Sequence, residues 1–410
     1  MALNILWIAF FLIAFVIALY KFIFLHDTEI FKVLVDGIFD SAKGSVLDVA
    51  FPLAGTMVFF LGLMNIAEKA GAINRLARLL NPFMKRLFPG VPDQHPAMGL
   101  MVMNFSANML GLDNAATPFG LKAMESLQTL NPKKETATDA QIMFLVLHTS
   151  GLTIIPLSIL SYRLAAGSVN AASVFIPCVL GTVCTTLAAI LITGLKQRIK
   201  WDAVLIGWIL SISVLVGLLM VWVSSLSPES KNIFGKVAGN LLLLLVIILI
   251  LAAAIRKKVP VFDAFIDGAR QGFDVVIKVI PYLVGLLVAI RVFRDSGALG
   301  YIVDGLTAIV RSLGINSDFT PALPVAIMKP FSGSGARGLM LDVMKANGPD
   351  SFVGQMACTF HGSADTTFYI VALYFGSVGI KKVRYAIWAG IAADLIGVVA
   401  AILIGYIFFR

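Results

Sequence analysis

Two histidines stand in matching polar contexts that could bind a solute or handle a proton. His148 opens the sequence HTSGLT and His361 opens HGSADT. In both motifs a serine and a threonine follow the histidine at the same spacing; they are Ser150 and Thr153 in the first motif and Ser363 and Thr366 in the second. Imidazole exchanges protons near neutral pH, and hydroxyls both donate and accept hydrogen bonds. Apolar runs adjoin both motifs, and the recurrence of His, Ser and Thr at equal spacing favours a shared site over packing or serine and threonine bonding within a helix.

A second pair of polar segments follows apolar runs elsewhere. Residues 104–120 read NFSANMLGLDNAATPFG, and residues 329–338 read KPFSGSGARG. Two surface turns are the simpler interpretation, but turns rarely recur with the same apolar flanks. We therefore predict broken helices around a polar site. The candidate solute-binding residues are Asn104, Ser106, Asn108, Asp113 and Asn114 in the first segment and Lys329, Ser332, Ser334 and Arg337 in the second.

Charged groups inside these segments allow two interpretations. Lys329 and Arg337 flank the second segment, and Asp365 lies in the HGSADT motif. Buried charge in a membrane protein is costly, and it is usually paired or functional. In the first interpretation, Lys329 or Arg337 forms an ion pair with Asp365 that only holds the two polar segments together. Alternatively, the cations bind an anionic or zwitterionic solute while Asp365 binds its amine or a proton. For Asp394, in the last apolar stretch, the favoured role is a bond to a neighbouring helix.

The elements that position these residues are predicted to be transmembrane helices. The chain is 59% apolar and only 13% charged, whereas soluble proteins carry about 25% charged residues. About 20 apolar residues cross a bilayer. Predicted spans cover residues 1–20, 46–66, 171–195, 203–223, 238–255, 275–292 and 383–409, and predicted amphipathic stretches cover 27–43, 73–88, 260–271 and 299–313. The first span lacks a cleavage site and a basic start, so we expect it to be retained.

Basic clusters predict the orientation. The net charge of +9 is concentrated in short groups such as residues 196–200 and 256–258. Such groups beside spans mark the cytoplasmic side and do not indicate a nucleic-acid surface. The spans at 203–223 and 238–255 should form a hairpin whose link, 224–236, lies outside. The basic stretch 73–88 is expected at the headgroup interface. We expect a multi-pass protein of the bacterial cytoplasmic (inner) membrane.

Several chemistries find no support in the sequence. Cys178, Cys184 and Cys358 show no CxxC spacing and are interpreted as packing residues. No GxxxxGK[ST] phosphate loop occurs. We therefore expect no metal and no cofactor, and energy from a partner protein or from a gradient, with a proton or sodium as the candidate coupling ion.

The chain is predicted to contain a duplication. EKAGAI at 68–73 and RDSGAL at 294–299 have the same separation as Phe105-Ser106 and Phe331-Ser332. The two histidine motifs and the two AAILI sequences at 188–192 and 400–404 share a shorter separation, to within one residue. Fixed separations over several motifs indicate a repeat. We predict one repeat over residues 1–200, a connecting helix and external link over 201–236, and a second repeat over 237–410.

The same motifs carry a resemblance to a known family. Residues 95–99 and 104–126 resemble the spore maturation protein A family, and residues 280–299 and 348–382 resemble the spore maturation protein B family. Both are members of the nucleoside-recognition (Gate) family, which is similar to parts of concentrative nucleoside transporters and of the ferrous iron permease. The resemblance implies inverted halves, whereas the charge distribution leaves inverted and parallel halves both open. The fusion of both parts argues against a strictly sporulation-linked role, and the missing G domain argues against iron uptake.

The predicted fold is an all-α polytopic membrane protein with two homologous repeats and broken or re-entrant helices. The predicted function is a permease for an amino acid, peptide or nucleoside, with its site between the repeats. A membrane assembly or regulatory component that transports nothing is the alternative. An enzyme using His148, His361 and Asp365 as acid–base groups ranks last, because no nucleophile–base pair supports it. Expected partners are the lipid bilayer and a small polar solute, not nucleic acid; a homo-oligomer is left open.

Overall fold

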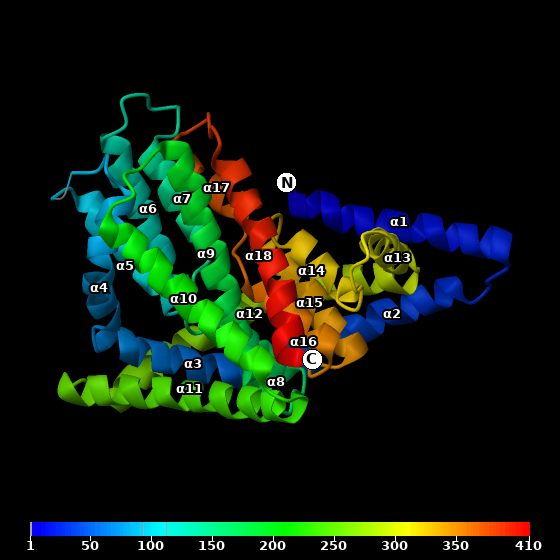
Figure 1. Cartoon of the computed structure of the whole chain (residues 1–410). Coiled ribbons are helices and arrows are strands. Elements are labelled where there is room, and N and C mark those ends of the chain that lie inside the picture. The colour runs from blue at the N-terminus through cyan, green and yellow to red at the C-terminus, as the bar shows by residue number, and fades with distance from the viewer. Residues whose placement is uncertain (1, 93, 112) are drawn as a thin grey trace. The chain divides into compact units, whose positions relative to one another are not determined.

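The computed structural model of this chain is built from helices, and it describes residues 2–92, 94–111 and 113–410. Figure 1 shows the helices in chain order. Within the described residues no β-strand forms, and an isolated bridge pairs Thr136 with Lys382. The segments of this described part that are long and apolar enough to cross a bilayer are Trp7–Leu25, Ile30–Lys69, Ala171–Gln197, Ala203–Ser225, Val237–Arg256 and Ala386–Phe409. The protein is therefore an all-α, multi-pass membrane protein.

Two compact units make up the chain, and each collects three separate stretches of sequence. Unit 1 consists of Met1–Gly62, Ser158–Ala171 and Asp267–His361. Unit 2 consists of Leu63–Leu157, Ala172–Ile266 and Gly362–Arg410. Both units thus contain helices from the first and the second half of the sequence. The predicted boundaries at residues 200 and 237 divide the chain into sequence repeats, not into compact units. These repeat boundaries stay a prediction.

Unit 1 contains the N-terminal helices and most of the second half. Its elements are α1 (Ala2–Leu25), α2 (Ile30–Gly44), the π-helical turn η1 (Ser45–Ala50), the first part of α3 (Phe51–Lys69), α8 (Leu157–Ala165), most of α12 (Val261–Asp295), α13 (Ala298–Ser312), the short turn η3 (Thr320–Ala322), α14 (Leu323–Met328), α15 (Gly333–Asn347) and α16 (Phe352–Gly362). A small apolar core joins α1, α2 and α12 through Ala14, Ala18, Ile30, Leu34 and Val292.

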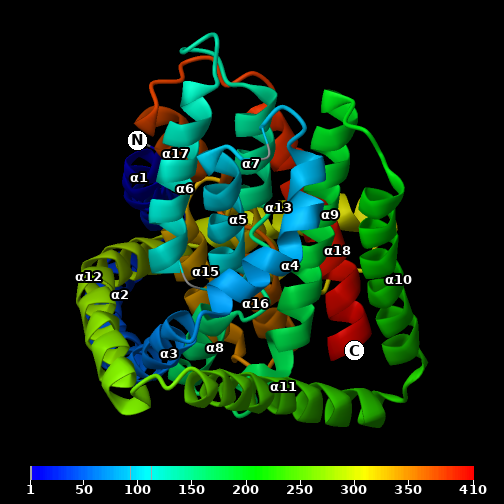
Figure 2. The same ribbon diagram turned by 90° about the vertical axis from the view of Figure 1, so that its left-hand side faces the viewer.

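Unit 2 has an extensive apolar core, which includes Met84, Met101, Phe144 and Phe375. Its elements are α4 (Ala72–Leu87), α5 (Pro96–Met109), α6 (Asp113–Thr129), α7 (Asp139–Thr149), α9 (Phe175–Gln197), α10 (Ala203–Ser225), α11 (Pro228–Arg256), α17 (Thr367–Ser377) and α18 (Ala386–Phe409), with the turn η2 (Ala171–Val174) before α9. Figure 2 shows α9 and α18 side by side. They approach closely because Gly397 has no side chain; a Cβ there would overlap Thr185 Oγ1.

Local sequence explains where these helices begin. Thr138 and Gln141 form a reciprocal capping box at the start of α7. Asp202 caps α10, since its Oδ1 accepts a hydrogen bond from Leu205 N over 2.8 Å. That backbone N–H and the Arg86 guanidinium, 2.6 Å away, lower the pKa of the Asp202 carboxyl. The basic helix α4 is thereby tied to the start of α10.

At two places, elements that the sequence predicts as separate join into one helical run. The predicted amphipathic stretch 27–43 and span 46–66 join through η1 into one helical run, Ile30–Lys69. The stretches 260–271 and 275–292 join within α12. Neither junction contains a residue that stops helical hydrogen bonding. At the first junction, the π-turn η1 inserts an extra residue without ending the helix. The change from amphipathic to apolar sequence therefore marks a change of environment, not a helix end.

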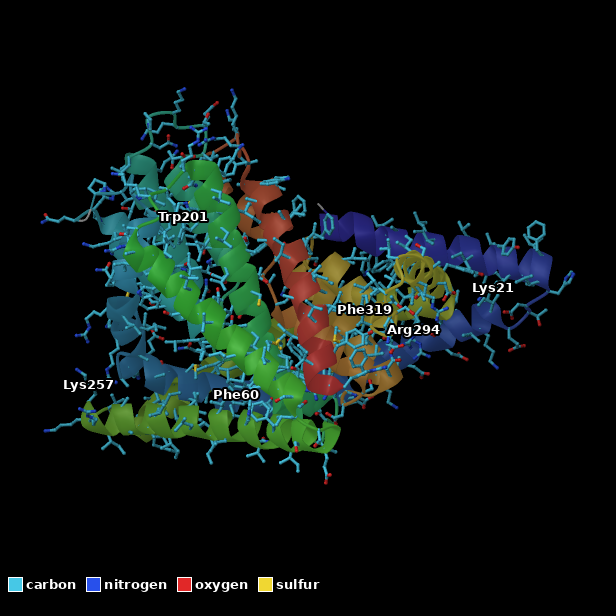
Figure 3. All side chains as sticks on the ribbon, viewed as in Figure 1. Lys21, Phe60, Trp201, Lys257, Arg294 and Phe319 are labelled. Atoms are coloured by element: carbon cyan, nitrogen blue, oxygen red, sulfur yellow. The ribbon has the colours of Figure 1, made fainter. Side chains whose placement is uncertain are left out.

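The two helices of the predicted hairpin, 203–223 and 238–255, diverge instead of packing side by side. α10 and α11 meet at Leu226 and Ser227, and Figure 1 shows them diverging from this turn. Trp201, just before α10, and Lys257, just after α11, are labelled at the distant ends of these two helices in Figure 3. The side of the membrane on which each basic cluster lies stays a prediction.

Candidate functional site

A buried polar cluster surrounds His148 in unit 2. His148 Nδ1 lies 3.1 Å from Asn104 Oδ1 and 2.8 Å from Asn108 Nδ2. The hydroxyl of Tyr374 lies 3.3 Å from the same nitrogen. Asn104 is 1% exposed and His148 is 5% exposed. This cluster contradicts the interpretation of Asn104 and its neighbours as a surface turn.

Helices α5, α6, α7 and α17 position the cluster. Asn104 lies on α5, and its Nδ2 donates to Ala116 O on α6 over 2.7 Å and to Tyr374 Oη over 3.3 Å. Phe144, one turn before His148 on α7, stacks on the Tyr374 ring with centroids 5.7 Å apart. Gly120 on α6 leaves the space that the Tyr374 hydroxyl fills. The orientation of Tyr374 is therefore fixed by packing and by hydrogen bonds together.

The two histidine motifs meet at their breaks. α7 ends at Thr149, and Gly151 follows in the left-handed conformation with φ +63°, which is typical of a helix C-terminus. From the second motif, Asp365 N donates to Thr149 O over 2.8 Å. Asp365 Oδ1 accepts from Thr366 N over 2.7 Å, and the carboxylate is close enough to act on His148 electrostatically. Non-helical segments from both sequence halves are thus joined by a hydrogen bond inside unit 2.

Hydroxyl groups from α9 and α17 and a carboxylate from α18 complete this region. Ser150 Oγ lies 2.9 Å from Thr186 Oγ1, and Thr185 donates to Ser363 O over 2.7 Å. Thr153 N donates to Thr182 Oγ1 over 3.4 Å. Asp394 Oδ2 on α18 accepts from Thr367 Oγ1 on α17 over 2.7 Å, which is the helix-to-helix bond favoured by the sequence.

The second Gly/Ser segment lies in unit 1 at the start of α15. Ser332 caps this helix by accepting from Gly335 N over 3.0 Å, and its Oγ lies 3.3 Å from Ser334 Oγ. The Arg337 guanidinium lies over the Tyr162 ring, 5.2 Å from its centroid. Lys329 and Arg337 are close enough to act on His361 electrostatically. Because Asp365 belongs to unit 2, the predicted ion pair with these cations stays a prediction.

The polar breaks are narrower than predicted. Asn104, Ser106 and Asn108 lie within α5, and only a few residues separate α5 from α6. The second segment is helical from Gly333 onward. The side chains of Asp113 and Asn114 fall outside the described residues. Asparagine and glycine can occupy the last turns of a helix as well as a loop. The composition therefore overestimated the length of the non-helical segments.

Several residues of the cluster were missed by the sequence interpretation. Tyr374, Thr185 and Thr186 lie in long apolar runs, where a single polar group is common and carries no motif. The weak signal was their position: Tyr374 follows the HGSADT motif by a few helical turns. Within the described residues, no group of three or more His, Cys, Asp or Glu side chains could hold a metal ion. The predicted lack of a cofactor stays a prediction.

The cluster can relay hydrogen bonds, because each member both donates and accepts. A neutral imidazole has one N–H and one acceptor nitrogen, so His148 Nδ1 serves either Asn104 Oδ1 or Asn108 Nδ2, according to its tautomer. Polar groups buried in this way rigidify a core when all are satisfied. Ser106 Oγ is buried and has no hydrogen-bond partner among the described residues.

Comparison with known proteins agrees with these features. Spore maturation protein B of Bacillus subtilis (strain 168) is 47% identical over 148 residues, which cover 36% of this chain and 82% of that protein. Spore maturation protein A of the same organism is 37% identical over 189 residues, which cover 46% of this chain and 92% of that protein. No solved structure matches. The model of the nucleoside recognition (Gate) family matches twice, over residues 50–169 and 276–381. With more than half of its residues matched, this chain belongs to the nucleoside recognition (Gate) family.

Proposed function

We propose that this chain is a permease of the bacterial inner membrane for a small polar solute of the amino acid, peptide or nucleoside class. The polar breaks of both sequence halves replace the hydration shell of the solute, and movement of the helices around them alternates access. A proton or sodium gradient supplies the energy. The duplicated halves are inverted relative to one another, as the resemblance to Gate transporters implies.

One observation carries this proposal: polar breaks from both halves meet inside unit 2. Asp365 N bonds to Thr149 O over 2.8 Å, and the chain departs from helix on both sides of that contact. Irregular chain at membrane depth survives only inside protein or beside a wet cavity. Transporters place such breaks at their solute sites, where free N–H and C=O groups are available. Both matches to the Gate model include one of these breaks.

A specific observation also favours the second candidate, a membrane assembly component that transports nothing. Asn104, Asn108, His148 and Tyr374 bond to one another, and so they have fewer groups to offer a solute. A closed network of this kind fixes helix positions, which is what an assembly component requires. The two candidates differ in whether the purified protein moves a solute.

Uptake into proteoliposomes tests the proposal. The probes are labelled alanine, dialanine and uridine, one for each solute class, with and without proton or sodium gradients. We expect flux of at least one probe, and a loss of about tenfold or more in Asp365→Asn, Lys329→Met or Arg337→Met, because buried charges at such sites are rarely dispensable. Exposed Asp263→Asn and Lys133→Met are the matched controls and should keep wild-type flux.

The outcomes separate the candidates. Flux that survives unchanged in all three variants would remove these residues from the mechanism. A protein that binds and moves none of the probes, while its His148 cluster remains needed for folding, would support the assembly role.

A further inference from the structure

A charged, partly open cavity lies in unit 1; Asp48 and Lys345 in its lining are exposed, and none of its lining residues belongs to the polar breaks. Its volume is about 320 Å³, and its walls are the end of α2 with η1, the end of α8, α12 and α15. The polar lining residues that matter here are Ser45, Asp48, Arg291, Arg294, Asp342 and Lys345. Pockets for small molecules range from about 300 to 1,000 Å³. This cavity therefore suits an occupant of amino-acid size better than a nucleotide.

Two arginines of α12 form one wall. Arg294 Nη1 lies 2.6 Å from Asp342 Oδ1, and Arg291 forms an ion pair with Asp295 one turn further along α12. Arg294, in the last turn of α12, is labelled in Figure 3. Each guanidinium has five N–H donors in a planar fork, and the described ion pairs use only some of them. The remaining donors can bind a carboxylate in the cavity.

Asp342 supports this wall from α15. It is only 7% exposed, and a carboxylate so buried is costly unless a cation compensates it. Its contact with Arg294 provides that compensation and holds the guanidinium beside the cavity.

Lys345 and Asp48 face each other across Gly44. A methyl group on Gly44 would lie 3.0 Å from Asp48 Oδ2 and 3.4 Å from Lys345 Nζ. Among the ion pairs formed by the described residues, none includes either group. The cavity thus presents one cation and one anion that ion pairing leaves available. Both lie beside η1, a π-helical turn of a type frequent at functional sites.

We propose that this cavity binds a small zwitterion of the α-amino acid class. Its carboxylate accepts hydrogen bonds from the spare donors of Arg291 and Arg294 and from Lys345. Its ammonium donates to Asp48 and to Ser45 Oγ, whose own hydrogen is given to Ser41 O over 2.5 Å. A simple anion fits less well, because Asp48 and Asp342 would repel it. Binding here requires no flux, so this inference goes beyond the proposed permease activity.

Equilibrium dialysis of the purified full chain in detergent, with labelled L-alanine as the probe, tests the proposal. Propionate and ethylamine, which each carry only one of the two charges, are the competing half-molecules. We expect saturable alanine binding, and competition by either half-molecule that is weaker by about tenfold or more, since one lost ionic contact costs at least that factor. Inorganic phosphate should compete no better than propionate.

Variants locate the binding. Lys345→Met and Asp48→Asn should each weaken alanine binding about tenfold or more, since each removes one ionic contact. Gly44→Leu should abolish it by filling the cavity. The controls are Lys43→Met, an exposed neighbour on α2, and Gly55→Leu, which has open space around it. Size-exclusion profiles confirm that each variant is folded.

Three results would overturn the proposal. They are the absence of alanine binding to the wild type, equal competition by propionate and alanine, and unchanged binding in both Lys345→Met and Asp48→Asn. Dialysis measures no transport, so a failure here is distinct from a failure of the permease proposal. If Asp365→Asn loses flux but still binds alanine, the assignment of this cavity as an amino-acid site stands.

Discussion

The hydroxyl of Tyr374 occupies the space that a side chain at position 120 would need. Gly120→Ala should therefore displace Tyr374 from Asn104 and His148. We expect a loss of unfolding free energy of about 1–3 kcal/mol, typical of an added methyl group in a packed core. Thermal unfolding in detergent measures it.

Gly99 on α5 provides the matched control, since nothing lies within 4 Å of a Cβ built there. Gly99→Ala should be neutral or stabilising by about 0.5–1 kcal/mol, because alanine is the better helix former. Equal stabilisation of both variants would show that Tyr374 moves aside without cost and that the cluster is not tightly packed.

At the residue scale, the sequence predicted groups of residues better than their contacts. The spacing of His148, Ser150 and Thr153 identified a polar break, and the structure joins that break to the one at Asp365. Tyr374 could not be predicted, because an apolar helix does not reveal which face carries its single hydroxyl. Asp342 was missed for the opposite reason: charged residues on a helix such as α15 are usually solvated, whereas Asp342 is buried.

At the element scale, a buried arginine fastens the end of α8 to the loop between α15 and α16. Arg163 is 0% exposed, and its Nη2 lies 2.7 Å from Asp350 Oδ1. Its other donors bond to Ala171 O over 3.1 Å, Pro349 O over 2.5 Å and Asn170 O over 3.2 Å. One side chain therefore satisfies carbonyls from two loops of unit 1.

Arg163→Met should cost about 3–5 kcal/mol of unfolding free energy, because it leaves several carbonyls without their donor and removes the cation paired with Asp350, which keeps its bonds from Ser168 and Val169. Arg163→Lys should rescue little, since an ammonium cannot reproduce the planar fork. Asp350→Asn should cost less, because that side chain is 31% exposed. Exposed Arg75→Met is the control and should stay within about 0.5 kcal/mol of wild type. A small loss in Arg163→Met would mean that the two loops are held by other contacts.

Helix types were easier to predict from the sequence than helix ends. Long apolar runs became α1, α9, α10 and α18 with modest changes in bounds. The run at 238–255 became α11, but this helix begins at Pro228, so most of the predicted link 224–236 is helical. The runs that join through η1 and within α12 were divided wrongly, because the sequence pattern shows where polarity changes and not where hydrogen bonding stops. The π-turn that borders the cavity of unit 1 leaves no composition signal at all.

At the scale of the whole molecule, the helices that follow the two histidine motifs belong to different units. The helix after the first polar break, α8, packs in unit 1, and the helix after the second, α17, packs in unit 2. A repeat in sequence indicates similar elements, but it does not indicate which copy each element packs against. The duplication itself stays a prediction, supported by the same helix order after both breaks and by the two matches to one family model.

Orientation in the membrane depends on whether α10 and α11 both cross it. Each contains a segment long and apolar enough to do so, Ala203–Ser225 and Val237–Arg256. Two crossings would return the basic residues 256–258 to the side of 196–200, as the distribution of lysine and arginine predicts. If α11 instead lay along the surface, residue 257 would share the side of the turn at Ser227.

Cysteine labelling in spheroplasts distinguishes these arrangements. Cys178, Cys184 and Cys358 are replaced by alanine, and Ser227→Cys, Lys200→Cys and Lys257→Cys, all exposed positions, are made singly. A membrane-impermeant maleimide should label residue 227 in intact spheroplasts, and residues 200 and 257 only after permeabilisation. Labelling of residue 257 without permeabilisation would place α11 at the outer surface. The second half would then enter the membrane from the opposite side, which would reverse the relative orientation of the two halves.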